Sequence, residues 1–596
     1  MQALMLAAGM GTRLGKYTEA KAKCMIEVGG KSLIGHAADA LKLAGISKLI
    51  VVVGWESEKL ISFIEQNITG IECEFIQNRD YATTNNIYSL YLAKDRLCQD
   101  DTILLESDLI FDSTLIRRMV ESPEKNLVAV AKYEQWMDGT VTTLTDSGTI
   151  RNFIDKKHFR FSDAEQYYKT VNIYKLSREF SEQQYIPFLE AYLTAFGKNQ
   201  YYEAVLGALV QLDDTLLNAF VLRNETWYEV DDAQDLDIAN TLFATDSDKL
   251  VRYEFHDGGN WRFPGLTDFC YPANPYFPTP KMKDQIRYSL DSLITQPPSG
   301  MDILKLLAGK IFSTEKEYML VGSNASGLMK PLSERLSGTV TVCGSDEAVG
   351  YFGKCGSVRR VEFSADKLIA AAQDSGTLFF CNPDNAGRFL GRDDVVRILG
   401  ACRDNGTRCI IDETYADYAD REMRFELISN QILTGYPNLV VLKNLSHTFG
   451  VPGLQVSVMA CSDEALINSL GVEMPVWNIS SVAEYFMQIY SLYKKDFAAA
   501  CGNTSAQRAM LIAGLKSLPG LEVYPSQANY VVCRVNGNIS AKELASKLLY
   551  ENRILVRELS DRDGFPDRQH IRVTVRQESE NALLLSAMKE ILQPDR

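Results

Sequence analysis

Short apolar runs alternate with amphipathic segments over the first 245 residues of the chain. The runs at residues 3–8, 48–54, 101–106 and 127–131 have the length of buried strands, and longer segments of mixed polarity separate them. Strands that alternate with helical segments are typical of an open, mostly parallel α/β sheet. We therefore predict a Rossmann-like open sheet over residues 1–245.

A second unit of the same class follows a short polar stretch. Residues 246–264 are polar, contain the sequence Asp-Gly-Gly-Asn-Trp and show no regular period, so we predict a linker there. Residues 265–596 again alternate apolar and amphipathic segments and form a unit large enough for its own core. The two halves do not resemble each other, which indicates a fusion and not a duplication.

Composition narrows the classes of partner. The net charge of −15 argues against a surface for nucleic acid or an anionic membrane, because such partners favour basic patches. No stretch approaches the roughly 20 uninterrupted apolar residues that a membrane span needs. The 12 cysteines have no metal-ligand spacing, which favours reduced thiols. We therefore expect a cytoplasmic protein that binds neither nucleic acid nor membrane.

The first predicted strand runs into a glycine-rich loop that carries a cation. Gly9, Gly11 and Gly15 surround Arg13, and a second cation, Lys23, precedes the next apolar run. Glycine lets a backbone turn sharply and bring its N–H groups against a phosphate chain. A strand, a glycine loop, an Arg and a Lys in this order predict a site for a nucleoside triphosphate.

The motif in this loop resembles one known signature. Residues 6–14 read Leu-Ala-Ala-Gly-Met-Gly-Thr-Arg-Leu and resemble the signature of the nucleotidyltransferases that make sugar nucleotides and CDP-choline. Residues 23–25 resemble their second element, with Ala22 in place of the usual Pro. The resemblance implies that Arg13 holds the β- and γ-phosphates and Lys23 the α-phosphate. It assigns nucleotide binding to Leu6, Ala8, Gly9, Gly11, Thr12, Asn86 and Ser89, although Asn86 and Ser89 sit where helix capping is an equal explanation.

Two aspartates complete this resemblance. Asp108 follows an apolar run, and Asp231 ends a Trp-Tyr-Glu-Val-Asp sequence that resembles a late element of the same family. In the family these aspartates bind Mg²⁺, a hard ion that takes one or two carboxylates together with phosphate oxygens and water. The resemblance therefore implies that Arg13, Lys23, Asp108 and Asp231 carry catalysis, with Mg²⁺ as cofactor.

The reaction expected is attack of a phosphate or phosphonate oxygen on the α-phosphorus, with pyrophosphate leaving. Residues 136–141 and 167–175 resemble the phosphocholine and phosphonate cytidylyltransferases, which implies CTP and an acceptor such as phosphocholine, phosphoethanolamine or 2-aminoethylphosphonate. Several aromatic residues either surround the acceptor ammonium or pack in the core: Trp136, Tyr167, Tyr168, Trp227 and Tyr228. The alternatives are uridylyl or thymidylyl transfer to a sugar 1-phosphate, and a non-catalytic assembly or regulatory protein.

The C-terminal half resembles a different family. Residues 381–387, Cys-Asn-Pro-Asp-Asn-Ala-Gly, and residues 410–415, Ile-Ile-Asp-Glu-Thr-Tyr, resemble the fold-type I aminotransferases of the histidinol-phosphate aminotransferase kind. The resemblance places Asn385, Asp412 and Tyr415 at a pyridoxal phosphate site. It gives Arg572 the role of receiving a substrate carboxylate. Because these enzymes build their sites at a dimer interface, it also implies a homodimer through residues 265–596.

One expected residue is missing from that site. Residues 446–455 match the family's lysine motif, but Ser446 is followed by His447 where the Schiff-base lysine stands, and Gln455 replaces the phosphate-binding arginine. Imidazole cannot form an internal aldimine, so ordinary transamination should be lost. Binding of pyridoxal or pyridoxamine phosphate stays open.

Three interpretations of His447 remain. The first is a degenerate fold retained for dimerisation or regulation. The second is altered chemistry, in which His447 acts as a base on an unanchored cofactor. The third is an engineered exchange of Lys for His, against which the additional loss of the arginine at Gln455 argues.

Overall fold

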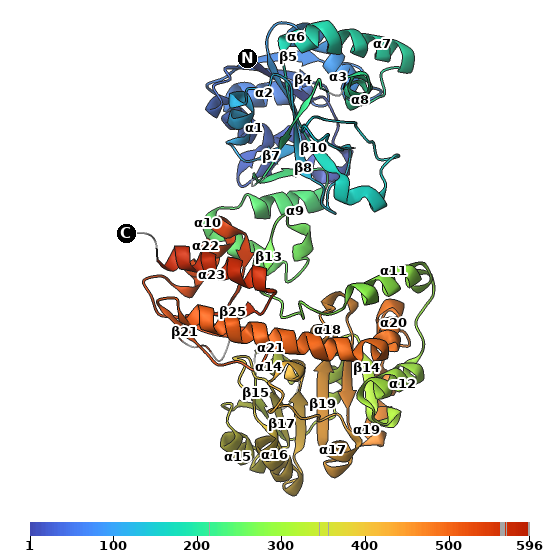
Figure 1. Cartoon of the computed structure of the whole chain (residues 1–596), viewed down its shortest axis with the longest axis vertical. Helices are drawn as coiled ribbons and strands as arrows, with labels where there is room; N and C mark the ends of the chain where they lie inside the picture. The colour runs from blue at the N-terminus through green and yellow to red at the C-terminus, as the bar shows by residue number, and fades with distance from the viewer. Residues whose placement is uncertain are drawn as a thin grey trace. The chain divides into compact units, whose positions relative to one another are not determined.

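The computed structural model describes residues 1–213, 215–223, 225–344, 346–353, 355, 357–560, 565, 567 and 569–593. The chain divides into two compact units, Met1–Pro264 and Gly265–Arg596 (Figure 1). All 12 cysteines are free thiols. No helix in the described residues is long and apolar enough to cross a lipid bilayer.

The N-terminal unit is built on a mixed sheet with the strand order β11-β8-β10-β6-β1-β4-β5, and β9 pairs with β10. Pairs β1–β4, β1–β6, β4–β5 and β8–β11 are parallel, whereas β10 runs antiparallel to β6 and β8. These strands are β1 (Gln2–Ala7), β4 (Lys48–Val53), β5 (Glu72–Gln77), β6 (Thr102–Glu106), β8 (Leu127–Lys132), β9 (Val141–Thr142), β10 (Tyr168–Leu176) and β11 (Asn218–Val221). The predicted open α/β sheet is confirmed.

Helices on both sides of this sheet explain why its central strands are apolar without alternation. Every residue of β1 is buried, as parallel strands covered on two faces require. The helices are α1 (Leu33–Leu43), α2 (Ser57–Asn67), α3 (Asn86–Leu92), α4 (Lys94–Leu97), α5 (Leu115–Glu121), α6 (Arg178–Phe180), α7 (Ile186–Phe196), α8 (Glu203–Leu212), α9 (Ala233–Leu242) and α10 (Asp246–Phe255). Two small antiparallel pairs accompany them, β2 (Glu27–Val28) with β3 (Lys31–Ser32) and β7 (Leu109–Phe111) with β12 (Trp227–Glu229).

The stretch predicted as an aperiodic linker differs from that expectation. Its first half is the helix α10, which buries Leu250 and Tyr253, and residues 246–264 belong to the N-terminal unit. The ring of Tyr253 lies 4.4 Å from that of Phe263. A helix forms here because one apolar face finds a partner within the unit, which polar composition alone does not reveal.

The C-terminal unit contains a seven-stranded sheet with the order β14-β20-β19-β18-β17-β15-β16, in which only β20 runs antiparallel to its neighbours. A smaller antiparallel sheet has the order β21-β22-β25-β24, and β13 pairs with β23. The strands are β13 (Thr267–Asp268), β14 (Met319–Gly322), β15 (Thr339–Cys343), β16 (Ser357–Arg360), β17 (Thr377–Cys381), β18 (Arg408–Asp412), β19 (Leu439–Asn444), β20 (Ser457–Ala460), β21 (Leu521–Val523), β22 (Tyr530–Val535), β23 (Ile554–Leu555), β24 (Arg557–Glu558) and β25 (His570–Thr574).

The helices of this unit pack around both sheets, with the 23-residue helix α21 the longest among them (Figure 1). They are α11 (Pro280–Thr295), α12 (Met301–Phe312), α13 (Ala325–Ser333), α14 (Asp346–Gly350), α15 (Ala365–Gln373), α16 (Arg392–Asp404), α17 (Asn430–Gly435), α18 (Leu445–Thr448), α19 (Glu464–Glu473), α20 (Ser481–Tyr490), α21 (Lys494–Lys516), α22 (Ala541–Asn552) and α23 (Glu578–Leu592). A second α/β unit is thus present where the sequence predicts one.

Candidate active site

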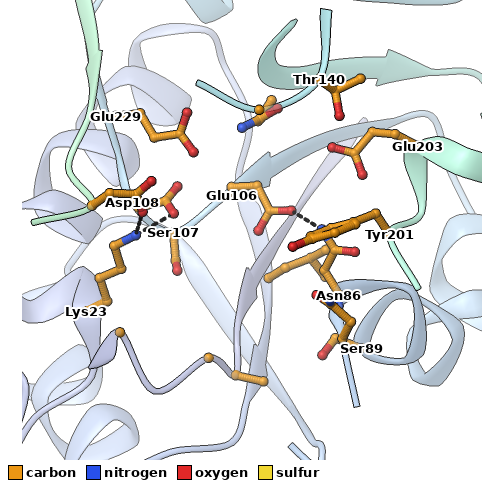
Figure 2. Close-up of a pocket in the computed structure, with 18 of the residues that line it drawn as sticks. Lys23, Asn86, Ser89, Glu106, Ser107, Asp108, Thr140, Tyr201, Glu203 and Glu229 are labelled. Atoms are coloured by element: carbon orange, nitrogen blue, oxygen red, sulfur yellow. Dashed lines mark hydrogen bonds and ion pairs between the residues drawn. The ribbon is translucent and has the colours of Figure 1, made fainter. Parts of the chain in front are cut away.

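An open cavity of about 660 Å³ lies in the N-terminal unit. Its wall includes every residue that the sequence analysis assigned to nucleotide binding, metal binding or catalysis in this half of the chain: Leu6, Ala8, Gly9, Gly11, Thr12, Arg13, Lys23, Asn86, Ser89, Asp108 and Asp231. Figure 2 shows Lys23, Asp108 and Glu229 on one side of this space and Asn86, Tyr201 and Glu203 on the other, with Glu106 between them.

The glycine loop forms the floor of this cavity. It leaves the end of β1, and Gly11 has a φ of 61°, a left-handed conformation that glycine adopts without strain. Thr18 donates a hydrogen bond of 2.8 Å to the carbonyl oxygen of Gly11, which holds the loop in place. A Cβ atom at Gly9 would meet nothing within 4 Å, so the backbone there faces open space that a phosphate chain can enter.

Backbone pairing brings the two predicted metal ligands together. The strand β7 follows Asp108 directly and pairs with β12, which ends two residues before Asp231. The register sets Leu109 opposite Glu229, and the N–H of Val230 donates to the carbonyl oxygen of Asp108 at 2.9 Å. Asp231 is further fixed because its N–H donates to the side chain of Asp235. The sequence motifs at Asp108 and Asp231 thus meet through a two-stranded ribbon.

Lys23 lies between these aspartates. Its Nζ atom donates to Oδ2 of Asp108 and to Oδ1 of Asp231, each at 2.7 Å. Burial alone would lower the pKa of Lys23, but the charges of Asp108 and Asp231 outweigh it and hold that pKa above its usual range. Arg13 reaches Asp231 from the mouth of the cavity at 2.9 Å, with 65% of its side chain exposed. One cation is therefore fixed in the site, and the other is free to move with a ligand.

A third carboxylate, Glu229, belongs to this cluster and was not singled out from the sequence. One oxygen each of Asp108, Glu229 and Asp231 lies within 4.8 Å of the other two. Burial, reinforced by the charges of Asp108 and Asp231 and opposed by Lys169, raises the pKa of Glu229 to about 7. The sequence did contain a signal that could have identified Glu229. Side chains alternate along an extended strand, so Glu229 and Asp231, two residues apart, project to the same side.

The cluster fits a Mg²⁺ ion. All three side chains offer carboxylate oxygens, the ligand type that this hard cation prefers. Oδ1 of Asp108 is buried and has no hydrogen-bond partner among the described residues, which is costly for a charged oxygen unless a ligand pairs with it. Asp108, Asp231 and Glu229 are therefore the residues that would hold the ion.

The opposite wall is organised by Asn86. Its side-chain amide donates to Oε1 of Glu106 at 3.1 Å, and its oxygen accepts from the N–H of Tyr202 at 3.1 Å. Ser89 accepts a hydrogen bond from Asn78 at 3.1 Å. The N-cap of α3 is the preceding residue, Asn85, and both Asn86 and Ser89 line the cavity.

The predicted aromatic enclosure of an ammonium group does not line this cavity. The ring of Trp136 stacks on Tyr228 at 4.5 Å and lies 5.3 Å from Trp227, and Tyr167 packs 5.1 Å from Phe159. None of the five predicted aromatic residues lines the cavity, and their rings lie against other side chains. They are Trp136, Tyr167, Tyr168, Trp227 and Tyr228. The core-packing alternative therefore holds for these rings.

In the C-terminal unit two of the motif residues, Tyr415 and Arg572, lie near His447. Asp412 ends β18, where its Oδ1 accepts from the N–H and hydroxyl of Thr414. The ring of Tyr415 lies 6.2 Å from that of His447 and 5.4 Å from that of Tyr530. Burial, together with the charge of Arg572, lowers the pKa of His447, so the imidazole is neutral at physiological pH.

The remaining residues of this set are Arg572 and Asn385. Arg572 stands 5.1 Å from the ring centre of Tyr530 and donates to the carbonyl oxygen of Cys270 at 3.2 Å. Asn385 is half-buried in the turn after β17. The tertiary structure thus brings Tyr415 and Arg572 close to His447, the position at which the lysine is missing.

The residues at this position do not fit a covalently anchored pyridoxal phosphate. His447 offers no primary amine. The hydroxyl of Ser446 is already bound to the N–H and carbonyl of Val456, and the amide of Gln455 donates to Pro452 at 2.9 Å. The side chains of Ser446 and of Gln455, which stands in place of the phosphate-binding arginine, are therefore engaged within the chain itself.

Comparison with protein families identifies both units. Residues 3–169 match the MobA-like NTP transferase domain, and residues 357–588 match the aminotransferase class I and II family. The chain thus joins a nucleotidyltransferase domain to an aminotransferase-fold domain, as the sequence motifs indicate. The histidinol-phosphate aminotransferase of Ruminiclostridium cellulolyticum is 25% identical over 338 residues, which cover 53% of this chain and 90% of that protein.

Relatives also match across both units. The CMP-5'-(3-aminopropyl)phosphonate synthase of Streptomyces rubellomurinus is 28% identical over 604 residues, which cover 99% of this chain and 95% of that protein. Among solved structures, a decarboxylase from Sulfurospirillum multivorans aligns with a TM-score of 0.51 at 23% identity, covering 59% of this chain and 100% of that one. The structural likeness shows a shared fold for the aminotransferase-like unit.

Proposed function

We propose that the N-terminal unit is a Mg²⁺-dependent cytidylyltransferase. It transfers CMP from CTP to a small phosphonate or phosphate that carries an amine, and it releases pyrophosphate. The observation that carries this proposal is the cavity in which the glycine loop, Lys23 and three carboxylates meet. The similarity of the whole chain to a CMP-aminopropylphosphonate synthase supports the choice of CTP and of an amine-bearing phosphonate.

In this proposal, each residue of the cavity has a role that follows from its position. The loop from Gly9 to Gly11 receives the triphosphate, and the exposed Arg13 turns from Asp231 to the β- and γ-phosphates. Lys23 places a permanent positive charge where negative charge develops on the α-phosphate. Mg²⁺, held by Asp108, Asp231 and Glu229, supplies further neutralisation of phosphate charge.

The acceptor needs no activation by a base. A phosphate monoester loses its second proton at a pKa of about 6, and a phosphonate also carries at least one ionised oxygen at neutral pH. Catalysis then consists of alignment and charge neutralisation, for which rigid groups such as the Lys23–Asp108 pair are suited. No covalent intermediate on the chain is required.

We further propose that the C-terminal unit does not transaminate and serves as a dimerisation unit. His447 cannot form a Schiff base, and Ser446 and Gln455 are bound within the chain. Absorbance with and without added pyridoxal phosphate tests this: a new aldimine band would overturn it. Sedimentation of the full chain at micromolar concentration should give a dimer, and a monomer would contradict the second part. Free thiols on all 12 cysteines agree with a cytoplasmic location.

The direct test is pyrophosphate release by the pure protein with Mg²⁺. CTP, UTP, dTTP and GTP are each combined with phosphocholine, phosphoethanolamine, 2-aminoethylphosphonate and glucose 1-phosphate. We expect turnover with CTP and an amine-bearing acceptor. Turnover with UTP or dTTP and glucose 1-phosphate would support nucleotidyl transfer but would show that the proposed nucleotide and acceptor are wrong.

A further inference from the structure

Glu203 presents an unpaired carboxylate oxygen to the cavity. It is the first residue of α8, is only 7% exposed and lines the wall opposite the carboxylate cluster (Figure 2). Its Oε2 atom is buried and has no hydrogen-bond partner among the residues that the structure describes. Burial raises the pKa of Glu203, so its ionised form is favoured only when a cationic group that is absent from the chain itself reaches this oxygen.

The cations along the cavity wall are engaged with other carboxylates. Arg13 and Lys23 bind Asp231 and Asp108, as described above, and Lys156 pairs with Asp138 at 2.8 Å. Lys169 lies 3.5 Å from Glu229 and donates to the carbonyl oxygen of Thr170 at 2.6 Å. Lys169 and Asn86 favour the charged form of Glu203 without reaching Oε2, and this oxygen is left for a ligand.

A second carboxylate faces the same part of the cavity. Figure 2 shows Glu106 projecting between the carboxylate cluster and Glu203, with its oxygen toward Asn86. Asn86 binds Oε1 of Glu106 and also the N–H of Tyr202, the residue before Glu203. One amide thus ties the end of β6 to the start of α8, and it fixes both carboxylates at one end of the cavity.

We propose that Glu203, with Glu106, binds the primary ammonium group of the acceptor and excludes a quaternary ammonium. This inference rests on the proposed cytidylyltransferase function. A primary ammonium has three N–H donors that need carboxylate or carbonyl acceptors, whereas a trimethylammonium has none and favours an aromatic cage. Among the described residues that line the cavity, the aromatic ones are Tyr81 and Tyr201, and Tyr201 is 60% exposed. Two carboxylates suit the first group and not the second.

The experiment compares three acceptors with the full chain: 2-aminoethylphosphonate, its N-trimethyl analogue and ethylphosphonate, which lacks the amine. Affinity is measured by calorimetry with Mg²⁺ and a non-hydrolysable CTP analogue, and turnover by pyrophosphate release with CTP. Wild type should prefer 2-aminoethylphosphonate to both analogues. Glu203→Gln should weaken binding of the primary amine by about ten- to a hundredfold, the usual scale of a hydrogen bond between charged groups. Its affinity for ethylphosphonate should not fall.

Ethylphosphonate controls for folding within each variant, because a misfolded protein loses both ligands. Glu203→Asp keeps the charge and should retain more of the preference than Glu203→Gln. Glu65→Gln, which changes an exposed residue of α2 outside the cavity wall, is the matched control.

If wild type turns over 2-aminoethylphosphonate but Glu203→Gln keeps the same preference for it, the ammonium site is wrong and the function stands. If wild type binds the amine through Glu203 without releasing pyrophosphate, the site stands and the function is wrong. If wild type prefers the trimethyl analogue, the inference is overturned.

Discussion

Lys23 donates a 2.7 Å hydrogen bond to Asp231, although 208 residues separate the two in sequence. The same Nζ atom binds Asp108, so one lysine joins the first loop of the N-terminal unit to the two strands β7 and β12. In the absence of a metal ion, Lys23 pairs with both aspartates of this cluster, while Lys169 lies 3.5 Å from Glu229. Lys23 is therefore expected to affect both catalysis and the stability of the site.

Lys23→Ala should reduce nucleotidyl transfer by at least about a hundredfold, since a fixed charge at the α-phosphate is lost. It should also lower the melting temperature without Mg²⁺, because three carboxylates then face each other without their central cation. Mg²⁺ should raise the melting temperature of this variant more than that of wild type. Thermal unfolding with and without Mg²⁺ measures this, with Lys21→Ala as the control. An equal Mg²⁺ effect in both proteins would contradict the bridging role.

Asp108→Asn should abolish nucleotidyl transfer, by a factor above about a hundred, while the fold is retained. The substitution keeps the shape of the side chain but removes a charged ligand of the proposed ion. Circular dichroism checks the fold, and pyrophosphate release checks the activity. Asp95→Asn, an exposed change on α4, serves as the matched control. Activity near that of wild type would show that the metal site is assigned to the wrong residues.

The affinity for Mg²⁺ should rise with pH between about pH 6 and 8. Burial raises the pKa of Glu229 to about 7, so the proton must leave before this carboxylate binds an ion. Below pH 7 the proton competes with Mg²⁺, and well above it the affinity should level off. Titration of pyrophosphate release with Mg²⁺ at each pH measures the effect. Glu229→Gln should bind Mg²⁺ more weakly and lose most of this pH dependence; an unchanged slope would exclude Glu229 as its source.

Stability of the C-terminal unit should fall as pH rises from about 5 to 8. Burial raises the pKa of Glu413 from 4.5 to about 8, with Lys443 opposing the shift. The folded state therefore holds a proton that the unfolded state has released, and its stabilising contribution is lost as pH rises through the folded pKa. The slope is at most about 1.4 kcal/mol per pH unit.

Hydrogen exchange of the β18 amides, corrected for intrinsic rates, reports this stability for the C-terminal unit. Glu413→Gln should flatten the dependence, and Glu422→Gln, on an exposed residue, should not. A slope that survives in Glu413→Gln would assign the titration to another group.

Reduction with borohydride in the presence of pyridoxal phosphate should leave residue 447 unmodified in wild type. Imidazole forms no reducible Schiff base. The nearby Lys443 is buried and paired with Asp417 at 2.5 Å. Burial lowers its pKa, but the charges of Asp417 and Glu413 outweigh this effect and raise it. Peptide mass analysis detects any adduct, and the double variant His447→Lys, Gln455→Arg provides the comparison. A pyridoxyl group on Lys443 of wild type would show that this lysine reaches a cofactor.

The sequence predicted those parts of the molecule whose chemistry is local. The apolar run before Gly9 predicts β1, and the glycine at position 11 predicts a turn because its φ of 61° favours that residue. Asp108 stands at a strand end, and its local motif is enough to identify it as a candidate metal ligand. His447 is equally local, since the absence of an amine is visible from the residue type alone.

Other features were decided by tertiary structure alone. Glu229 and Glu203 gain their meaning from burial and from partners far away in the chain, namely Asp108 for Glu229 and the Asn86 region for Glu203. Trp136 could face a ligand or the core, and the tertiary structure shows its ring half-buried on Tyr228 and outside the cavity wall. Charge, burial and register depend on which strands pair, and strand pairing is a property of the whole fold that short motifs do not encode.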